Sequence, residues 1–180
     1  MNHFVKGNPD LCIGCRTCMI SCVIAHEGRR IFEIDPDGYD FNPRLHMVKT
    51  RKISVPVQCK HCEDPACMAA CPKNCITIQN HSVYLDTKGC IGCKSCMEAC
   101  SFGAIDMVTT KSEKQIDGSE RVIANKCDLC ANVPGGPACV RTCPTDALQL
   151  VEEEMLEEKV ANRRLEAARS LAVTKEFPNG

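Results

Sequence analysis

The chain has 180 residues and a formal net charge of −1, so its size suits one domain or two small ones. Aromatic residues make up 4% of the chain and Trp is absent, whereas 17 residues are Cys, so a thin apolar core accompanies abundant thiols. The absence of a basic run argues against a nucleic-acid partner. No apolar stretch approaches the roughly 20 residues that span a membrane, and we expect a reducing, anaerobic cytoplasm.

The cysteines fall into four tight runs, which does not favour a secreted disulfide framework. Their number is odd, and the N-terminal Met1–Gly7 has no apolar signal segment. The first run, Cys12–Cys22, and the third, Cys90–Cys100, both have the C-x2-C-x2-C-x3-C spacing that binds [4Fe-4S] clusters. The second, Cys59–Cys71, is spaced 2-4-3, and the fourth, Cys127–Cys143, consists of two separated pairs. Four quartets predict four [4Fe-4S] clusters.

Zinc is the main alternative, because an isolated C-x2-C pair is also typical of a zinc-binding interaction module. Zinc takes four ligands from two such pairs and has no use for the third and fourth Cys of each run. Gly14 and Gly92 fall inside two of the C-x2-C pairs, where the chain must turn tightly. The seventeenth thiol, Cys75, occupies a place that Ala104 and Ala147 take after other runs, so we interpret it as a small core residue and not a ligand.

Short alternating apolar stretches beside the runs predict strands at His3–Val5, Ser54–Val57, Ile76–Gln79, Val83–Leu85, Ala104–Val108, Arg121–Ala124 and Ala147–Val151. A turn at Asn80-His81 predicts a hairpin that joins runs two and three into one unit, residues 51–108. Runs one and four are then left to form an outer unit, residues 1–50 and 109–151. In that unit we expect residues 3–5 to pair beside 147–151, and residues 44–49 beside 121–124. The predicted fold is α+β: two nested bacterial-ferredoxin-like units with short β-hairpins, and a C-terminal α-helix.

In two-cluster ferredoxins the fourth Cys of each run binds the neighbouring cluster, and this exchange rule assigns the ligands. The outer unit is predicted to hold cluster A with Cys12, Cys15, Cys18 and Cys143, and cluster B with Cys127, Cys130, Cys139 and Cys22. The inner unit is predicted to hold cluster C with Cys59, Cys62, Cys67 and Cys100, and cluster D with Cys90, Cys93, Cys96 and Cys71.

Three further features lie outside the ligand sets. Gly28–Asn42 is expected to be a surface loop, and Lys111–Glu120 a hairpin tip around Asp117-Gly118. His61 beside Cys62 is either a group that tunes a cluster through a hydrogen bond or, as we favour, part of the polar surface.

Residues 152–173 lack Cys, Gly and Pro and contain strong helix formers, so they predict a helix within a C-terminal segment, 152–180. Acidic residues at its start and arginines further on complement the helix dipole. Its apolar residues form two stripes on roughly opposite sides, which suits packing against more than one neighbour. The alternative is a helix folded back on its own domain.

With its four runs in place, the chain resembles the four-cluster polyferredoxin subunits of the dimethyl-sulfoxide-reductase superfamily, in the HycB/HydN-like branch associated with formate dehydrogenase and hydrogenase. The resemblance covers about residues 1–151 and is carried by Met1-Asn-His-Phe-Val, Cys12-Ile-Gly-Cys-Arg-Thr-Cys18, Pro43-Arg-Leu-His, His61-Cys-Glu-Asp64, Lys126-Cys-Asp-Leu-Cys130, Gly136-Pro-Ala-Cys139 and Cys143-Pro-Thr-Asp-Ala-Leu148.

The resemblance implies a non-catalytic electron-transfer subunit that connects a hydrogenase with a molybdenum or tungsten formate dehydrogenase, as in formate hydrogenlyase or hydrogen-dependent CO2 reductase. The implied partners are the formate dehydrogenase catalytic subunit, a hydrogenase subunit and related polyferredoxins. Through the 152–173 helix they also include a second copy of the chain, with a filament as one form of assembly. Alternatives are a stand-alone ferredoxin or maturation factor and the iron–sulfur subunit of another molybdopterin oxidoreductase. The sequence shows no nucleophile–base pair and no phosphate-binding loop, in agreement with a non-catalytic role.

Overall fold

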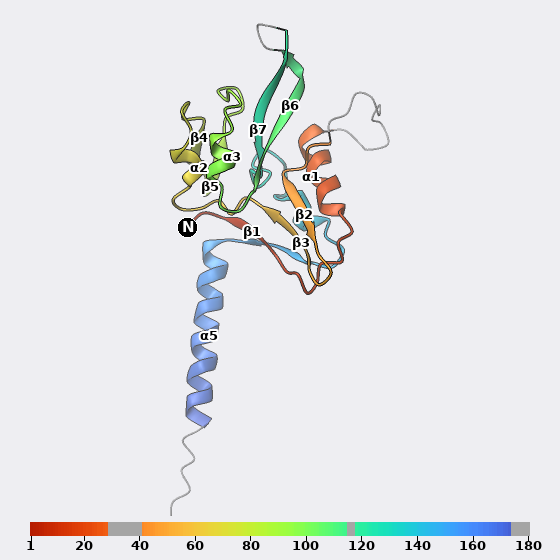
Figure 1. The fold of residues 1–180 in the computed structure, drawn as a ribbon. Helices are drawn as coiled ribbons and strands as arrows, with labels where there is room; N and C mark the ends of the chain where they lie inside the picture. Colours follow the sequence, from red (N-terminus) through yellow and green to blue (C-terminus); the bar gives the residue numbers. More distant parts are fainter. Residues whose placement is uncertain (29–40, 115–117, 174–180) are drawn as a thin grey trace, which may run out of the picture.

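The computed structural model describes residues 1–28, 41–114 and 118–173 (Figure 1). The described helices are α1 (Thr17–Glu27), α2 (Ala66–Ala69), α3 (Ser95–Ala99), α4 (Ala138–Arg141) and α5 (Glu153–Val173). The described strands are β1 (Phe4–Gly7), β2 (Leu45–Lys49), β3 (Ser54–Gln58), β4 (Ile76–Gln79), β5 (Ser82–Leu85), β6 (Ile105–Lys114), β7 (Glu120–Lys126) and β8 (Leu148–Val151). The predicted α+β fold class with a C-terminal helix is confirmed.

The strands form four two-stranded antiparallel sheets in the described part of the chain. The predicted pairing of the two ends is confirmed, because β1 pairs with β8 and brings Phe4 opposite Val151. The predicted hairpin between β4 and β5 is also confirmed, and both residues of its turn, Asn80 and His81, have positive φ angles of 46° and 57°. Asn tolerates this left-handed conformation better than most residues, which explains why the turn was recognisable.

The predicted pairing of residues 44–49 with 121–124 is wrong. Strand β2 pairs instead with β3, the next strand along the chain, and β7 pairs with β6. Thr50 makes the local reversal possible, since its hydroxyl accepts the Ile53 N–H at 3.0 Å and its own N–H donates to the Ile53 carbonyl at 2.8 Å. A short loop costs less closure entropy than a distant pairing, so two local hairpins form in place of one long-range sheet.

The two predicted inserts lie partly outside the described residues. Strands β6 and β7 form the hairpin expected around 111–120, while residues 115–117 at its tip are not described. Strand β6 is longer than predicted, and the proposed unit boundary at residue 108 falls inside it. In the Gly28–Asn42 insert, residues 29–40 are not described. Gly28 ends α1 with φ 67° and donates its N–H to the Ile24 carbonyl at 3.0 Å.

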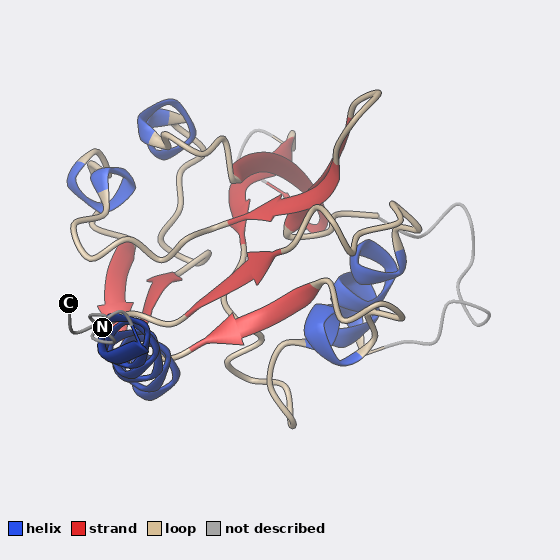
Figure 2. Cartoon of the chain, turned by 90° about the horizontal axis from the view of Figure 1, so that it is seen from below, coloured by secondary structure: helices blue, strands red, loops and turns tan. Residues whose placement is uncertain are grey.

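The short helices pack in two pairs, α1 with α4 and α2 with α3. Figure 2 shows these pairs on opposite sides of the strands. Each pair has its own buried apolar cluster. The first contains Val5, Cys18, Cys22, Leu45, Cys139 and Leu148, and the second contains Cys67, Ile76, Val83, Cys96, Ile105 and Ala124. Runs one and four therefore share one core, and runs two and three share most of another.

Helix α5 projects away from the body (Figure 1). Its first turn is attached to the N-terminus, where the Met1 ammonium lies 2.5 Å from the Glu153 carboxylate. Both apolar stripes are exposed: Leu156 on one has 41% of its surface accessible, and Leu165 on the other has 50%. The alternative of a helix folded back on its own domain is therefore wrong for this structure. No helix among the described residues has the length and apolar character needed to cross a bilayer.

Candidate metal centres

All 17 cysteines lie in the described part of the chain, and none is in a disulfide. Three separate apolar pockets are each lined by a complete predicted quartet. The first contains Cys12, Cys15, Cys18 and Cys143, the second contains Cys59, Cys62, Cys67 and Cys100, and the third contains Cys71, Cys90, Cys93 and Cys96. The fold thus brings together the thiols that the exchange rule assigns to sites A, C and D.

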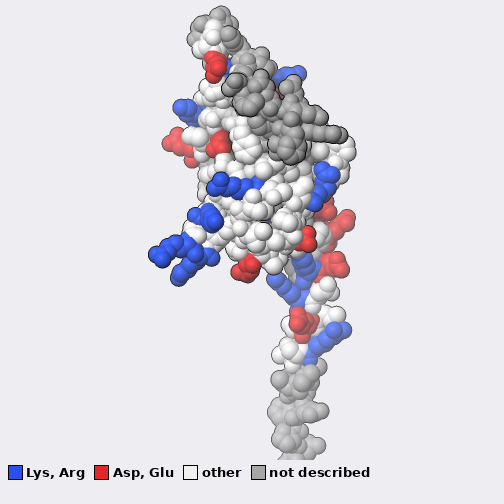
Figure 3. Space-filling view, turned by 90° about the vertical axis from the view of Figure 1, so that its right-hand side faces the viewer, with Lys and Arg blue, Asp and Glu red and all other residues white. Residues whose placement is uncertain are grey.

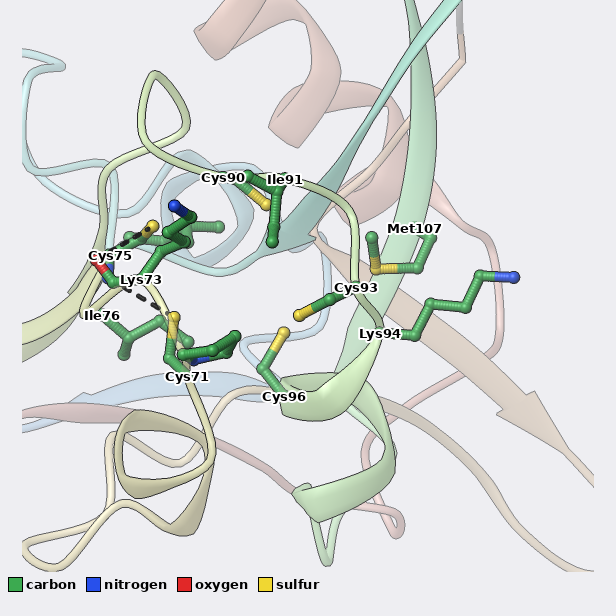
Figure 4. A pocket seen from close by; sticks show the side chains of 12 residues that line it. Cys71, Lys73, Cys75, Ile76, Cys90, Ile91, Cys93, Lys94, Cys96 and Met107 are labelled. Atoms are coloured by element: carbon green, nitrogen blue, oxygen red, sulfur yellow. Dashed lines mark hydrogen bonds between the residues drawn. The ribbon is translucent and has the colours of Figure 1, made fainter.

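The pocket of site D also receives Cys75. In Figure 4 the sulfur atoms of Cys71, Cys90, Cys93 and Cys96 point toward a common space, whereas the Cys75 sulfur lies against Lys73. The Cys75 thiol donates to the Lys73 carbonyl at 3.7 Å, and burial raises its pKa to about 11. This hydrogen bond holds the Cys75 sulfur outside the space that the other four sulfur atoms share, which supports the prediction that Cys75 is not a ligand.

The thiols of site B come together where α1 packs on α4. Cys127, Cys130 and Cys139 each interact electrostatically with Cys22, which reaches them from the first run. Sites A, C and D each have one exposed cysteine, namely Cys15, Cys62 and Cys93, whereas no cysteine of site B is exposed. Site B is the most enclosed of the four.

The same backbone turn recurs in all four C-x2-C pairs. The residue before the second Cys has a positive φ in each: 70° at Gly14, 48° at His61, 69° at Gly92 and 57° at Leu129. At Gly14 and Gly92 a side chain would also collide, with the Ser54 hydroxyl at 2.6 Å and the Val122 carbonyl at 2.5 Å. Glycine is therefore required at Gly14 and Gly92 both by the positive φ and by the lack of room for a side chain. His61 and Leu129 adopt the same strained conformation with a side chain.

In each run the fourth Cys, which the exchange rule assigns to the neighbouring cluster, accepts a hydrogen bond from a backbone N–H group. Cys71, Cys100 and Cys143 each accept from the residue four positions on, at 3.4, 3.4 and 3.3 Å. Cys22 accepts from the N–H of Arg44 at 3.4 Å. Such donors favour a charged thiolate over a neutral thiol, and the thiolate is the form that binds metal.

Burial raises the pKa of some thiols, and hydrogen bonds to hydroxyl groups lower the pKa of others. Burial raises the pKa of Cys139 to about 12 and that of Cys67 to about 11. The hydroxyls of Thr17 and Ser95 hold the pKa of Cys15 and Cys93 below the usual thiol value. The buried thiols therefore become thiolates only if a cation compensates them, as a bound metal would.

A charged network that we did not predict covers site B. The Asp128 carboxylate forms an ion pair with Arg44 and accepts from His26 Nε2 at 2.9 Å, while His26 Nδ1 donates to the Cys22 carbonyl at 2.7 Å. Burial opposes the charge on His26, but its hydrogen bonds to Asp128 and Cys22 raise its pKa to about 10. No motif spacing connects these residues. Asp128 between Cys127 and Cys130 was the available signal.

The expectation that His61 belongs to the polar surface is wrong, because only 1% of its surface is exposed. Its Nδ1 accepts the Val83 N–H at 2.9 Å, so Nε2 carries the proton, and Nε2 has no partner among the described residues. Burial and the nearby Lys126 charge lower the pKa of His61 to about 3, which keeps the ring neutral. No local sequence pattern indicates this burial, because strand β5, which covers His61, comes later in the chain.

These observations fit iron–sulfur clusters as the bound groups. Sites A, C and D each offer four thiols without a disulfide around an apolar space, and a backbone N–H is aimed at one sulfur atom of every site. A small α+β body with such thiol-lined sites defines an iron–sulfur protein of the ferredoxin type.

Comparison with known proteins leads to the same class. Residues 50–153 match the family model described as 4Fe-4S dicluster domain. Electron transport protein HydN of Escherichia coli (strain K12) is 37% identical over 174 residues, covering 93% of this chain and 98% of that protein. Formate hydrogenlyase subunit 2 of the same strain is 38% identical over 176 residues, covering 84% of this chain and 83% of that protein.

A third relative is longer. Putative oxidoreductase AegA of Escherichia coli (strain K12) is 40% identical over 169 residues, which is 94% of this chain but 25% of that protein. This chain thus spans about a quarter of that relative's length.

The chain belongs to the 4Fe-4S dicluster family of polyferredoxins that includes HydN and formate hydrogenlyase subunit 2. This membership supports iron–sulfur clusters over zinc and implies more than one [4Fe-4S] cluster.

The exchange of ligands between runs makes a direct prediction for Cys22→Ser. Because Cys22 lies with Cys127, Cys130 and Cys139, the variant should lose the iron of site B and retain that of sites C and D. Iron in the anaerobic protein should fall from about sixteen to about twelve atoms per chain. Cys75→Ser, another buried cysteine, serves as the control and should lose none. Loss of the spectroscopic signals of site C or D from the Cys22 variant would contradict the nested arrangement.

Proposed function

We propose that this chain is an electron-transfer subunit with four [4Fe-4S] clusters that passes electrons between a hydrogenase and a molybdenum or tungsten formate dehydrogenase. The observation that carries the proposal is the arrangement of four thiol quartets in one continuous body. The similarity to HydN over nearly the whole chain, and to formate hydrogenlyase subunit 2 over most of it, supports the same role. When bound, the clusters supply one-electron carriers, and the chain itself positions and shields them.

The contacts between quartets place site A beside site B and site C beside site D, and we propose the linear order A–B–C–D. Cys18 of site A lies beside Cys139 of site B in one buried cluster. Cys67 of site C lies beside Cys96 of site D in the other. The nested division, with an outer unit of 1–50 and 109–151 and an inner unit of 51–108, is part of this proposal. Exposed Cys15 and Cys93 then lie at the two ends, where electrons enter and leave.

A second candidate is a stand-alone electron carrier without a stable partner. It is favoured by HydN, a relative of similar length that is named only as an electron transport protein. Helix α5 favours the complex instead, because it projects from the body with both apolar stripes exposed (Figure 1). Figure 3 shows charged side chains of both signs along it. Exposed apolar area of this kind favours association, at about 25 cal/mol per Å2 buried. We therefore propose that α5 joins the chain to partner subunits or to a second copy.

Anaerobic purification of the tagged chain from its own cells tests the proposal. We expect catalytic subunits of a formate dehydrogenase and a hydrogenase to co-purify in fixed ratio. Both formate and hydrogen should then bleach the visible absorption of the iron–sulfur protein. A chain that elutes alone and is bleached by neither substrate, even after both enzymes are added back, would contradict the proposal. A chain that elutes alone but is reduced when they are added would favour the stand-alone carrier.

Removal of α5 by truncation after Val151 should leave iron content and reduction by dithionite unchanged while lowering the assembly state. Leu165→Asp should weaken assembly in the same direction, because it puts a charge on an exposed apolar stripe. Lys159→Asp places the same side chain at an exposed polar position and is the matched control. Sedimentation of the intact and altered complexes measures the effect, and unchanged particle size after truncation would show that α5 takes no part in assembly.

A further inference from the structure

Lys126, the last residue of β7, has a side chain that is almost completely enclosed, with 3% of the residue exposed. Its ammonium donates to the carbonyl of Cys127 at 2.6 Å and to the carbonyl of Val83. Among the described residues no carboxylate lies within ion-pair distance of it. Burying an ammonium that faces only carbonyl groups costs free energy, and a negative charge nearby lowers that cost.

The contacts of Lys126 place it between two sites. One acceptor belongs to Cys127, a predicted ligand of site B, and the other to Val83, which lines the pocket of site C. The charge of Lys126 also opposes the rise in pKa that burial causes at Cys127, Cys59 and Cys67. Lys126 therefore lies between a site of the outer unit and a site of the inner unit.

The neighbouring His61 adds no second positive charge. Its Nδ1 accepts the N–H of Val83 while Lys126 donates to the carbonyl of the same residue, so one residue of β5 is held from both sides. A ring nitrogen that accepts an N–H carries no proton, so the His61 ring is neutral. Two other cations near this junction, Arg44 and His26, are paired with Asp128. Lys60, which interacts with Cys59, is only half-buried, whereas Lys126 is fully enclosed and has no carboxylate partner among the described residues.

We propose that Lys126 is a positioning residue that raises the reduction potentials of sites B and C above those of sites A and D. This inference rests on the proposed four-cluster function. Reduction of a site adds one electron, here taken from a chemical reductant, and so one unit of negative charge. A cation buried beside the site attracts that added charge, and low local polarity strengthens the attraction. The charge of Lys126 is not among the main influences on the pKa of Cys15 and Cys18 in site A or of Cys93 and Cys96 in site D. Electrons are therefore expected to occupy sites B and C first.

Lys126→Gln tests the proposal, because glutamine removes the charge and keeps an N–H donor for one of the two carbonyls. The full-length protein is purified without oxygen and titrated with dithionite and redox mediators, and electron paramagnetic resonance follows each couple. We expect the reduction equilibrium of two of the four couples to weaken about tenfold, which is 59 mV for a one-electron couple. The reduction potentials of the other two couples should not change. Lys126→Arg keeps the charge and should hold the potentials of the two affected couples close to their wild-type values.

Lys88→Met, which removes an exposed lysine near Cys90, is the control and should move no couple, because water screens surface charges. Combining Lys126→Gln with Cys22→Ser, which lacks site B, should reduce the shifted couples from two to one. If Lys126→Gln loses iron, the test is a comparison of Lys126→Arg with the wild type in the same titration. An arginine variant in which the couples of sites B and C no longer have the higher reduction potentials would overturn the proposal.

The outcomes separate this inference from the function on which it rests. Wild-type protein with far fewer than sixteen irons would overturn the four-cluster function. Sixteen irons with all four couples unmoved in Lys126→Gln, or moved equally, would overturn only the role of Lys126.

Discussion

Chelation of iron from the anaerobic, reduced protein is expected to unfold most of residues 1–151. Eight of the twenty buried apolar residues in the described chain are cysteines, and seven of these belong to the predicted quartets. The described sheets are all two-stranded, and such sheets are marginal in water without further support. Metal ligation must therefore supply much of the folding free energy, as in other small metal-dependent domains.

Far-ultraviolet circular dichroism and the dispersion of amide NMR signals measure this loss. Reconstitution with iron and sulfide is the control and should restore both signals, which separates unfolding from irreversible damage. Helix α5 has no ligand, so its residual helicity after chelation should match that of an isolated 152–173 peptide. An iron-free protein with well-dispersed amide signals would contradict the expectation.

Anaerobically purified protein is expected to contain about sixteen iron atoms per chain, four for each thiol quartet. Cys75→Ala should leave this number unchanged, because the Cys75 thiol bonds to the Lys73 carbonyl and does not point into the space that the other four thiols share. Cys71→Ser, on the same pocket, should lower it by about four, because Cys71 points into the space shared with Cys90, Cys93 and Cys96 (Figure 4).

Iron and sulfide analysis of the three proteins side by side provides the measurement. The pair of variants is matched, since both remove one thiol from the same pocket. Loss of four irons from Cys75→Ala with none from Cys71→Ser would show that the two thiols have exchanged roles. About eight irons in the wild type would reduce the protein to two clusters.

Much of the structure follows from local sequence. The spacing within each cysteine run determines which thiols can bind the same cluster. A residue with a positive φ before the second Cys forms the turn that brings the first two thiols together. The β4–β5 hairpin follows from its Asn80-His81 turn, and α5 follows from a segment of strong helix formers without Gly or Pro. The pairing of β1 with β8 was also predictable, because it follows from which runs remain once two are joined.

Other features were decided only by the tertiary structure. Residues 45–49 have a pattern that suits several partners, and the short reversal at Thr50 selected β3 over β7. His61 and Lys126 look like surface residues in the sequence, since polar side chains carry no local signal of burial. Segments distant along the chain enclose both of them, where the N–H of Val83 donates to His61 and its carbonyl accepts from Lys126. Sequence spacing determines which thiols form a site, whereas the charges that surround each site depend on segments that only folding brings together.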